Sequence, residues 1–332
     1  MTILAGQPLL PLELPSAPPV TTAAPSALRH PKAPAIVLLL LGLLMTFGPI
    51  AGGLFAKTAS GQQMIQQFAP HMRASTLNRY GDDIRILYNA AVGVDTVFGD
   101  QHIPAGRFTG LDEFRQDSTA VIGRASDLLS RIRTTAPSYR RVAAIGGFNR
   151  IPFLIVAAGI VAIYGACVLL TGRRNRSRFA VALVVLASAA IGTYPFVSNL
   201  SSGAQAGQTM LRSLTSVMTP HEVRLLQGDF IVLVNADGEL ETSFRGVPQP
   251  GPSATAIITL VNDWPKISSD FASLVGVIDD NIANFNALDS LDSATRDVGL
   301  PGLSAFPWLL VALGSITAGL AVAALPRRRK ET

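Results

Sequence analysis

IPFLIVAAGIVAIYGACVLLTG, RRNRSR and FAVALVVLASAAIGTYPFV follow one another over residues 151–197 and decide the fold. Residues 151–172 and 179–197 carry no charge, and each is about 20 residues long, the length of a helix that crosses a bilayer core. Between them, residues 173–178 contain four arginines. Short basic loops of this kind lie on the cytoplasmic side of a membrane. The stretch therefore predicts a helical hairpin that crosses the membrane twice, with its tip in the cytoplasm.

Two further segments, residues 35–56 and 304–325, are also uncharged and long enough to span a membrane. Charged residues make up 15% of the chain, against about a quarter in soluble domains. The apolar stretch of residues 35–56 is longer than the roughly 7–15 residues of a signal-peptide core, so we expect it to remain in the protein. The four spans predict an all-α integral membrane protein and exclude a soluble enzyme.

The four spans divide the chain into segments of different composition. Residues 1–34 are rich in proline and predict a disordered cytoplasmic tail. Residues 57–150 and 198–303 form two extracytoplasmic segments, and residues 326–332 form a basic cytoplasmic tail. Because the basic clusters before residue 35, at 173–178 and after residue 325 share one side, we expect a plasma-membrane protein with both termini in the cytoplasm.

The charge distribution explains the basic composition. The three cytoplasmic pieces carry a net charge of +8, the first extracytoplasmic segment +4 and the second −7, which together give the +5 of the whole chain. The excess of positive charge is therefore largely a signal of membrane topology. It does not predict a nucleic-acid partner.

The two halves of the chain resemble each other at slowly increasing offsets. Pro49 corresponds to Pro195, residues 61–64 to 207–210, residues 81–82 to 228–229, residues 152–155 to 307–310, and residues 173–174 to 328–329. Each unit contains a span, an extracytoplasmic segment, a second span and a basic end. Since each unit crosses the membrane twice, the pattern predicts two parallel repeats, each with its own extracytoplasmic helical bundle.

Apolar residues recur at helical spacing in both extracytoplasmic segments. Thr219, Pro220 and Glu222 are typical of a helix start, with a capping residue, a proline in the first turn and a capping box. Residues 230–234 are compatible with a strand, but their counterpart at 82–90 favours a helix, so we expect a helix in both. Residues 98–110 and 243–253 predict loops. Helices at 58–68 and 204–214 are expected to continue spans one and three.

The residues that carry chemistry are sparse. The spans contain no Asp, Glu, Lys, Arg or His, the residues that mark ion and proton paths. The sequence contains no nucleophile elbow, phosphate-binding loop or zinc-protease motif. Cys167, the single cysteine, lies within a span and is expected to be a small buried residue. We therefore predict a non-enzyme with no catalytic residue, cofactor or metal site.

Small residues spaced four apart occur in three spans, two of which also contain a proline. Such spacings let helices approach closely, either within the bundle or against a partner membrane protein. The candidate packing or partner contacts are Gly48, Pro49 and Gly52 in span one, Ser188, Gly192 and Pro195 in span three, and Gly314, Ser315, Ala318 and Gly319 in span four.

The second unit carries a family resemblance. Its motifs are residues 218–220 (MTP), 226–229 (LQGD), 264–265 (WP), Phe285 and 306–308 (FPW); the first unit departs from them, with HMR at 71–73. With these motifs the chain resembles uncharacterised actinobacterial, mycobacterial-type envelope membrane proteins with four spans. The resemblance implies an accessory component of the cell envelope, of the kind associated with Mce-type lipid import, and it implies no catalytic residues.

The leading hypothesis is a non-catalytic accessory or scaffold subunit of an envelope membrane complex, in contact with membrane lipid and a membrane-protein partner. An extracytoplasmic sensor is an alternative. It would have to signal through a partner, because the predicted cytoplasmic pieces hold no signalling domain. A lipid-binding protein with an apolar cavity in its extracytoplasmic part is a third possibility.

Overall fold

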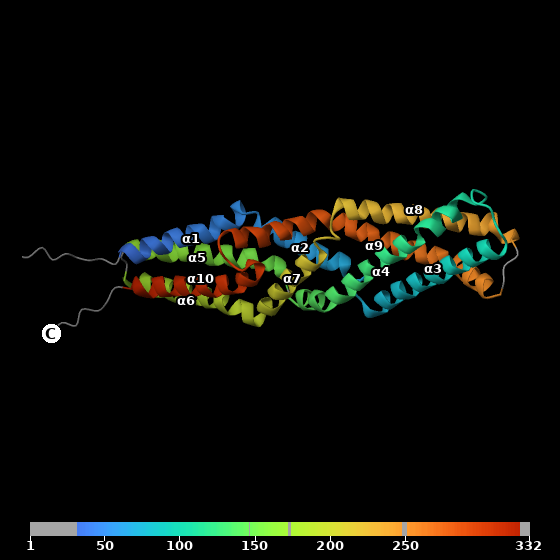
Figure 1. The fold of residues 1–332 in the computed structure, drawn as a ribbon. Coiled ribbons are helices and arrows are strands. Elements are labelled where there is room, and N and C mark those ends of the chain that lie inside the picture. Colours follow the sequence, from blue (N-terminus) through green and yellow to red (C-terminus); the bar gives the residue numbers. More distant parts are fainter. Residues whose placement is uncertain (1–31, 146, 172–173, 248–250, 326–332) are drawn as a thin grey trace, which may run out of the picture.

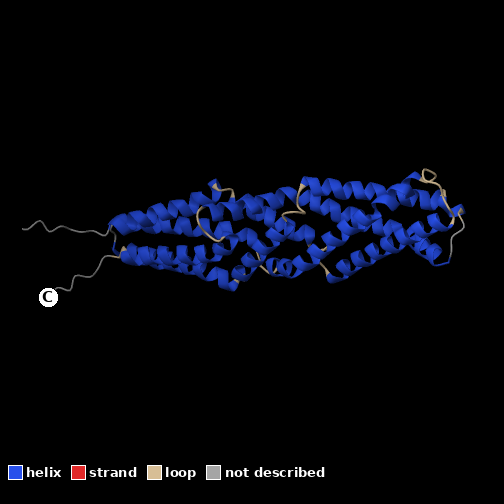
Figure 2. Ribbon diagram, viewed as in Figure 1, coloured by secondary structure: helices blue, strands red, loops and turns tan. Residues whose placement is uncertain are grey.

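The computed structural model describes residues 32–145, 147–171, 174–247 and 251–325. Within these ranges every regular element is a helix, as Figure 2 shows. The helices run along one long axis and form an elongated molecule (Figure 1). The all-α prediction is therefore confirmed. The predicted tail at 326–332, residues 1–31 of the predicted tail at 1–34, and residues 248–250 of the predicted loop at 243–253 lie outside the described residues. Residues 32–34 and 251–253 are helical, so the predicted tail and loop are wrong at these positions.

Four helices at one end of the molecule are long and apolar enough to cross a membrane. They are α1 (Lys32–Ala51), α5 (Ile151–Thr171), α6 (Arg174–Val197) and α10 (Phe306–Ala323). Helix α1 packs against α5, α5 against α6, and α6 against α10, and α10 returns to α1. The prediction of a multi-pass membrane protein is confirmed at this level. Span one ends at Ala51, earlier than the predicted residue 56, because the helix breaks at the left-handed residue Gly53.

The remaining helices form what we call the extramembrane bundle, which extends away from the spans (Figure 1). It contains α2 (Leu54–Phe68), α3 (Ala74–Asp100) and α4 (Thr109–Ala143) from the first half of the chain. The second half contributes α7 (Leu200–Leu214), α8 (Pro220–Thr242) and α9 (Gly251–Asp297). Residues 230–234 lie inside α8, so the choice of a helix over a strand is confirmed.

The two halves share one core instead of forming two separate bundles. Helices α2 and α3 pack against α9 of the second half, and α4 packs against α7 and α8. Both apolar clusters of the extramembrane bundle contain residues from both halves; Phe114, for example, is in the same cluster as Phe244. The predicted bundle for each segment is therefore not confirmed. The long helices α4 and α9 bury their apolar residues against helices of both halves: α4 against α3, α7 and α8, and α9 against α2, α3 and α8.

The two halves have the same order of α-helices, and the second adds a 3₁₀ helix, η2 (Phe244–Gly246), between α8 and α9. Each begins with a span and a left-handed residue, Gly53 (φ 63°) or Asn199 (φ 55°), followed by a helix of 15 residues. Each ends with a left-handed glycine, a short 3₁₀ helix and a span. These are Gly147 with η1 (Phe148–Arg150) and Gly302 with η3 (Gly302–Ala305). The left-handed residues are separated by 146 positions in the first pair and 155 in the second.

The predicted start of α8 is largely confirmed. Thr219 is the N-cap, Pro220 occupies the first turn, and the Thr219 hydroxyl accepts a hydrogen bond of 3.2 Å from the Glu222 backbone N–H. The Thr219 N–H donates to the Val217 carbonyl instead (2.9 Å). Of the two hydrogen bonds of a capping box, the structure therefore forms the one to the threonine side chain.

The candidate small residues of the spans fall into two groups. Gly314 lies against Ser188 and Gly192, and a Cβ at Gly314 would stand 2.6 Å from the Ser188 carbonyl oxygen. These three residues join α6 to α10 inside the chain. Gly52, Ser315 and Gly319 are exposed on the outside of the spans. The remaining candidates are buried or half-buried: Gly48, Pro49, Pro195 and Ala318.

A glycine contact that the sequence analysis missed joins α1 to α5. A Cβ at Gly42 would stand 2.9 Å from the Ile163 backbone nitrogen, and one at Gly159 would stand 2.9 Å from the Gly42 carbonyl oxygen. The two glycines belong to different helices, so no spacing within one span identifies them. Cys167, expected to be buried, is exposed on α5.

Candidate functional site

A polar cluster joins α3 to α9 within the extramembrane bundle. Arg79 of α3 forms two hydrogen bonds with the Asp270 carboxylate, at 2.5 and 2.9 Å. The Lys266 ammonium donates to Asp83 Oδ1 at 3.0 Å. Asp83 is buried, its Oδ2 has no hydrogen-bond partner, and burial raises its pKa. This cluster crosses between the halves of the chain, because α3 and α9 come from different halves.

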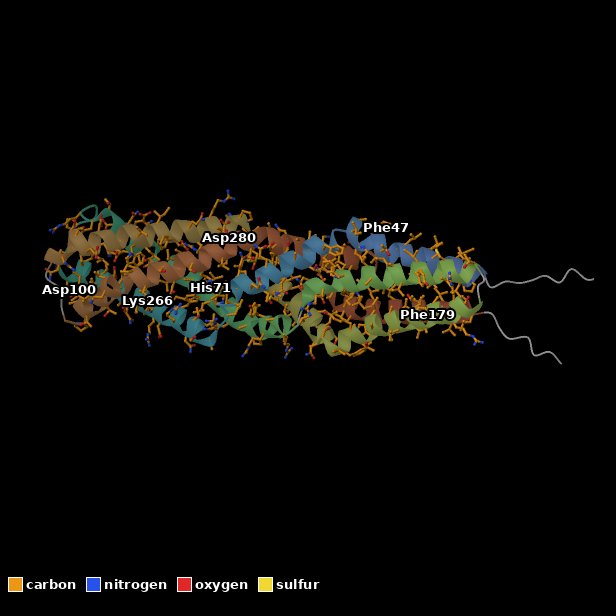
Figure 3. The ribbon with its side chains drawn as sticks, turned by 180° about the vertical axis from the view of Figure 1, so that it is seen from behind. Phe47, His71, Asp100, Phe179, Lys266 and Asp280 are labelled. Atoms are coloured by element: carbon orange, nitrogen blue, oxygen red, sulfur yellow. The ribbon has the colours of Figure 1, made fainter. Side chains whose placement is uncertain are left out.

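Beside this cluster, His71 and Tyr80 form a buried pair. The Tyr80 hydroxyl lies 2.6 Å from His71 Nδ1. Burial lowers the pKa of His71 and raises that of Tyr80 to about 12. Both groups are therefore neutral near pH 7, and the histidine tautomer decides which of them donates the hydrogen bond. The pair connects the turn after α2 to α3, which is a structural role. Figure 3 shows the positions of His71 and Lys266 in the bundle.

A second ion pair crosses between the halves from α4 to α8. Arg124 Nε donates to Asp229 Oδ2 at 2.8 Å, and its Nη2 donates to the other carboxylate oxygen. Asp229 is buried, and its hydrogen bond with Arg124 raises the pKa of the guanidinium. Helices α3 and α8 begin 146 positions apart in the sequence, so Asp229 occupies the position in α8 that corresponds to Asp83 in α3. The sequence comparison had paired Asp229 with Asp82.

A third polar group supports the junction between α9 and the last span. Asp292 is 1% exposed, and it accepts hydrogen bonds from the Leu303 N–H (2.7 Å) and the Gln208 side-chain amide (3.2 Å). Arg296 pairs with its second oxygen. Gln208 also donates to the Pro301 carbonyl at 2.7 Å. These contacts connect α7, α9 and η3 where the chain turns into the membrane.

The interior of the extramembrane bundle offers little room for a ligand. One apolar void of about 50 Å³ lies between α3, α4 and α9, and another of about 50 Å³ lies near the membrane between α2, α4 and α7. Ligand sites are typically about 300–1,000 Å³. Each void is too small for an acyl chain.

The larger hollows are open grooves at the end of the bundle far from the spans. A groove of about 690 Å³ lies between α3 and the start of α9, and one of about 440 Å³ lies between α3 and α4. Tyr88, Val92 and Thr96 line both and form the ridge that separates them. Figure 3 labels Asp100, which lies at this end of the molecule.

Exposed apolar side chains lie on α3, beside these grooves, and on α8. Tyr88 and Val92 on α3 are 56% and 50% exposed, and Ile231 on α8 is 59% exposed. Phe47 and Phe179 are exposed on the spans (Figure 3), where lipid would surround them. The sequence analysis missed Tyr88, Val92 and Ile231, because their exposure depends on which helix faces become covered.

The described residues contain no group of three or more His, Cys, Asp or Glu side chains placed to hold a metal ion. Several of their ion pairs join different helices, among them Arg79 with Asp270, Lys266 with Asp83, and Arg124 with Asp229. In comparisons with known proteins, no family model matches the chain and no curated relative is found.

Proposed function

We propose that this chain is a non-catalytic accessory or scaffold subunit of a membrane complex in the cell envelope. The observation that carries the proposal is the combination of a filled interior with exposed apolar side chains on the extramembrane bundle, such as Ile231. Contiguous exposed apolar patches mark sites of protein contact, and Ile231 and Val234, three residues apart on α8, are both exposed. The proposed association with Mce-type lipid import rests on the sequence resemblance alone.

The proposed topology places both termini in the cytoplasm and the extramembrane bundle outside the plasma membrane. The basic segments of the sequence support this orientation. We further propose that the chain arose by duplication of a span–bundle–span unit. The matching element order and the left-handed residues at offsets of 146 and 155 support the duplication. In this proposal the two copies exchange partners, with α3 on α9 and α8 on α4.

Lipid carriage is supported less well than scaffolding. The apolar void nearest the membrane is about 50 Å³, whereas carriage of an acyl chain needs a site of several hundred Å³. The proposed subunit would therefore serve its complex by contact and would leave lipid handling to its partners.

Affinity purification from native membranes in a mild detergent tests the scaffold proposal. The unmodified chain should bring down a stoichiometric membrane-protein partner. Ile231→Glu should abolish this recovery, because a charge would have to be buried in the contact. Gln227→Glu is the matched control, since it adds the same charge at an exposed position one turn earlier on α8. A chain that purifies without any stoichiometric partner would contradict the proposal.

A further inference from the structure

We propose that the groove between α3 and α9 binds a neutral, hydroxyl-rich chain, chemically an oligosaccharide. Its volume of about 690 Å³ lies within the range of about 300–1,000 Å³ that small-molecule sites occupy. The groove opens at the end of the molecule far from the spans (Figure 1). This binding activity is separate from the proposed contact with a protein partner on α8.

The ridge beside the groove supplies an aromatic surface. Tyr88 is 56% exposed and lines the groove, with Val92 one turn further along α3. A tyrosine combines an apolar ring face with a polar hydroxyl. A sugar ring has the matching character, since its C–H face is apolar and its edge carries hydroxyl groups.

The threonine hydroxyl groups of the groove are committed as donors but free as acceptors. Thr96, Thr255 and Thr259 donate to backbone carbonyls of their own helices at 2.8, 3.0 and 2.8 Å. A hydroxyl has one donor hydrogen and two acceptor lone pairs, so each threonine retains acceptor capacity toward the groove. A ligand complementary to these threonines donates hydrogen bonds to them, as sugar hydroxyls do.

The charge of the groove excludes an anionic ligand. Among the described residues that line the groove, Asp100 is the only charged one, and no Lys or Arg is present. Phosphate and carboxylate groups are recognised by cations, most often by arginine pairs. The groove walls are helices whose backbone groups already pair within each helix, so they offer no free edge for an extended peptide. A neutral ligand with many hydroxyl groups satisfies both conditions.

The test uses the full chain reconstituted in lipid nanodiscs, with maltoside detergents avoided because they carry a sugar. The probes are chitohexaose, maltohexaose and an α-linked mannohexaose, and binding is followed by saturation-transfer NMR and titration. At least one probe should bind saturably. Tyr88→Ala should weaken that binding at least tenfold, and Thr96→Val and Thr259→Val should each weaken it about threefold.

Thr134→Val is the matched control. Thr134 is exposed on α4, away from the groove, and makes the same hydrogen bond to the carbonyl four residues earlier (2.9 Å). Circular dichroism melting of every variant separates loss of binding from loss of fold. The proposal is overturned if no probe binds saturably, if Tyr88→Ala and both groove threonine variants bind within twofold of the unmodified chain, or if Thr134→Val weakens binding as much as they do.

Discussion

The two junctions at which the chain turns back into the membrane share a backbone but differ in what supports it. A left-handed glycine stands at both: Gly147 precedes a 3₁₀ helix, Gly302 is the first residue of one, and a span follows each helix. Behind Gly302 stands the buried Asp292, which accepts from the Leu303 N–H and from Gln208. Around Gly147 the neighbouring side chains are apolar, among them Ile145 and Phe148. The Gly147 carbonyl accepts a hydrogen bond of 3.4 Å from the Tyr194 hydroxyl.

This difference teaches that similar backbones in one chain need not be stabilised in the same way. A buried charge with several hydrogen bonds fixes one arrangement, because leaving any partner unpaired costs roughly 1–3 kcal/mol. Apolar packing tolerates small movements more readily. We therefore expect the second half of the chain to be more sensitive than the first to substitutions at matching positions.

The largest expected effect is at the junction glycines. Gly302→Ala should lower the free energy of unfolding by about 3–5 kcal/mol, because the residue has φ +84° and its Cβ would fall against Asp292 and Gln208. Gly147→Ala should cost about 1 kcal/mol, because the nearest atoms there belong to the exposed side chain of Arg150. Thermal denaturation in nanodiscs compares the two. Equal losses would remove the distinction between the junctions.

The next effect concerns the ion pairs that cross between the halves. Asp229→Asn should cost about 1–2 kcal/mol, because it breaks a two-point contact with Arg124. Asp83→Asn should change stability by less than about 0.5 kcal/mol, because Lys266 makes one bond, half of its side chain is exposed, and burial already disfavours the Asp83 charge. Chemical denaturation measures both. A larger loss for Asp83→Asn would reverse the comparison.

A stabilising substitution is expected at Asp237, whose counterpart in α3, 146 positions earlier, is Ala91. Asp237 is buried, its Oδ1 has no partner, and burial raises its pKa to about 6. The folded state therefore binds the proton more tightly than the unfolded state, so stability falls as pH rises from about 4 to about 6.

Asp237→Ala should remove this loss and raise stability by about 1 kcal/mol at pH 7, with little effect at pH 4. Melting temperatures measured across this pH range provide the check. Glu241→Gln serves as the control, since its charge also raises the pKa of Asp237 and its removal should give a smaller change of the same sign. A pH-independent effect of Asp237→Ala would show that the carboxyl does not titrate in this window.

A modest effect is expected at the far end of the bundle. The Glu239 carboxylate of α8 accepts hydrogen bonds from the Leu111 N–H (2.9 Å) and the Thr109 hydroxyl (3.3 Å) at the start of α4. Glu239→Gln should cost about 0.5–1 kcal/mol, because it removes a charge near a helix N-terminus. Hydrogen exchange should show faster opening of residues 109–115 and unchanged protection of α9. Unchanged exchange at both sites would mean that the cap does not hold this end.

Much of the fold follows from local patterns. The four spans need only uncharged segments of sufficient length, and residues 219–222 predict a helix start from their chemistry. The comparison with residues 82–90 placed residues 230–234 in a helix, which single-segment propensity left open. The spacing of Gly314 predicts close packing within the chain or against a partner, and in the structure Gly314 lies against Ser188 and Gly192.

The groove and the shared core could not be predicted in the same way. Tyr88 and Val92 are residue types that are often buried in a core, and their exposure depends on where α9 and α4 lie. Gly42 and Gly159 approach each other from different helices. Such features depend on pairs of positions far apart in the sequence, so the local spacing of apolar or small residues does not predict them.

The sequence by itself determined that the chain is helical, that four segments suit a membrane, and where several helices begin, because each of these depends on the polarity and chemistry of neighbouring residues. Only the tertiary structure decided that α3 packs on α9 and α4 on α8, so that two halves with similar patterns form one core. The physical reason is that burial of apolar surface is not directional. An amphipathic helix specifies which face is covered, and the geometry of the whole bundle selects the helix that covers it.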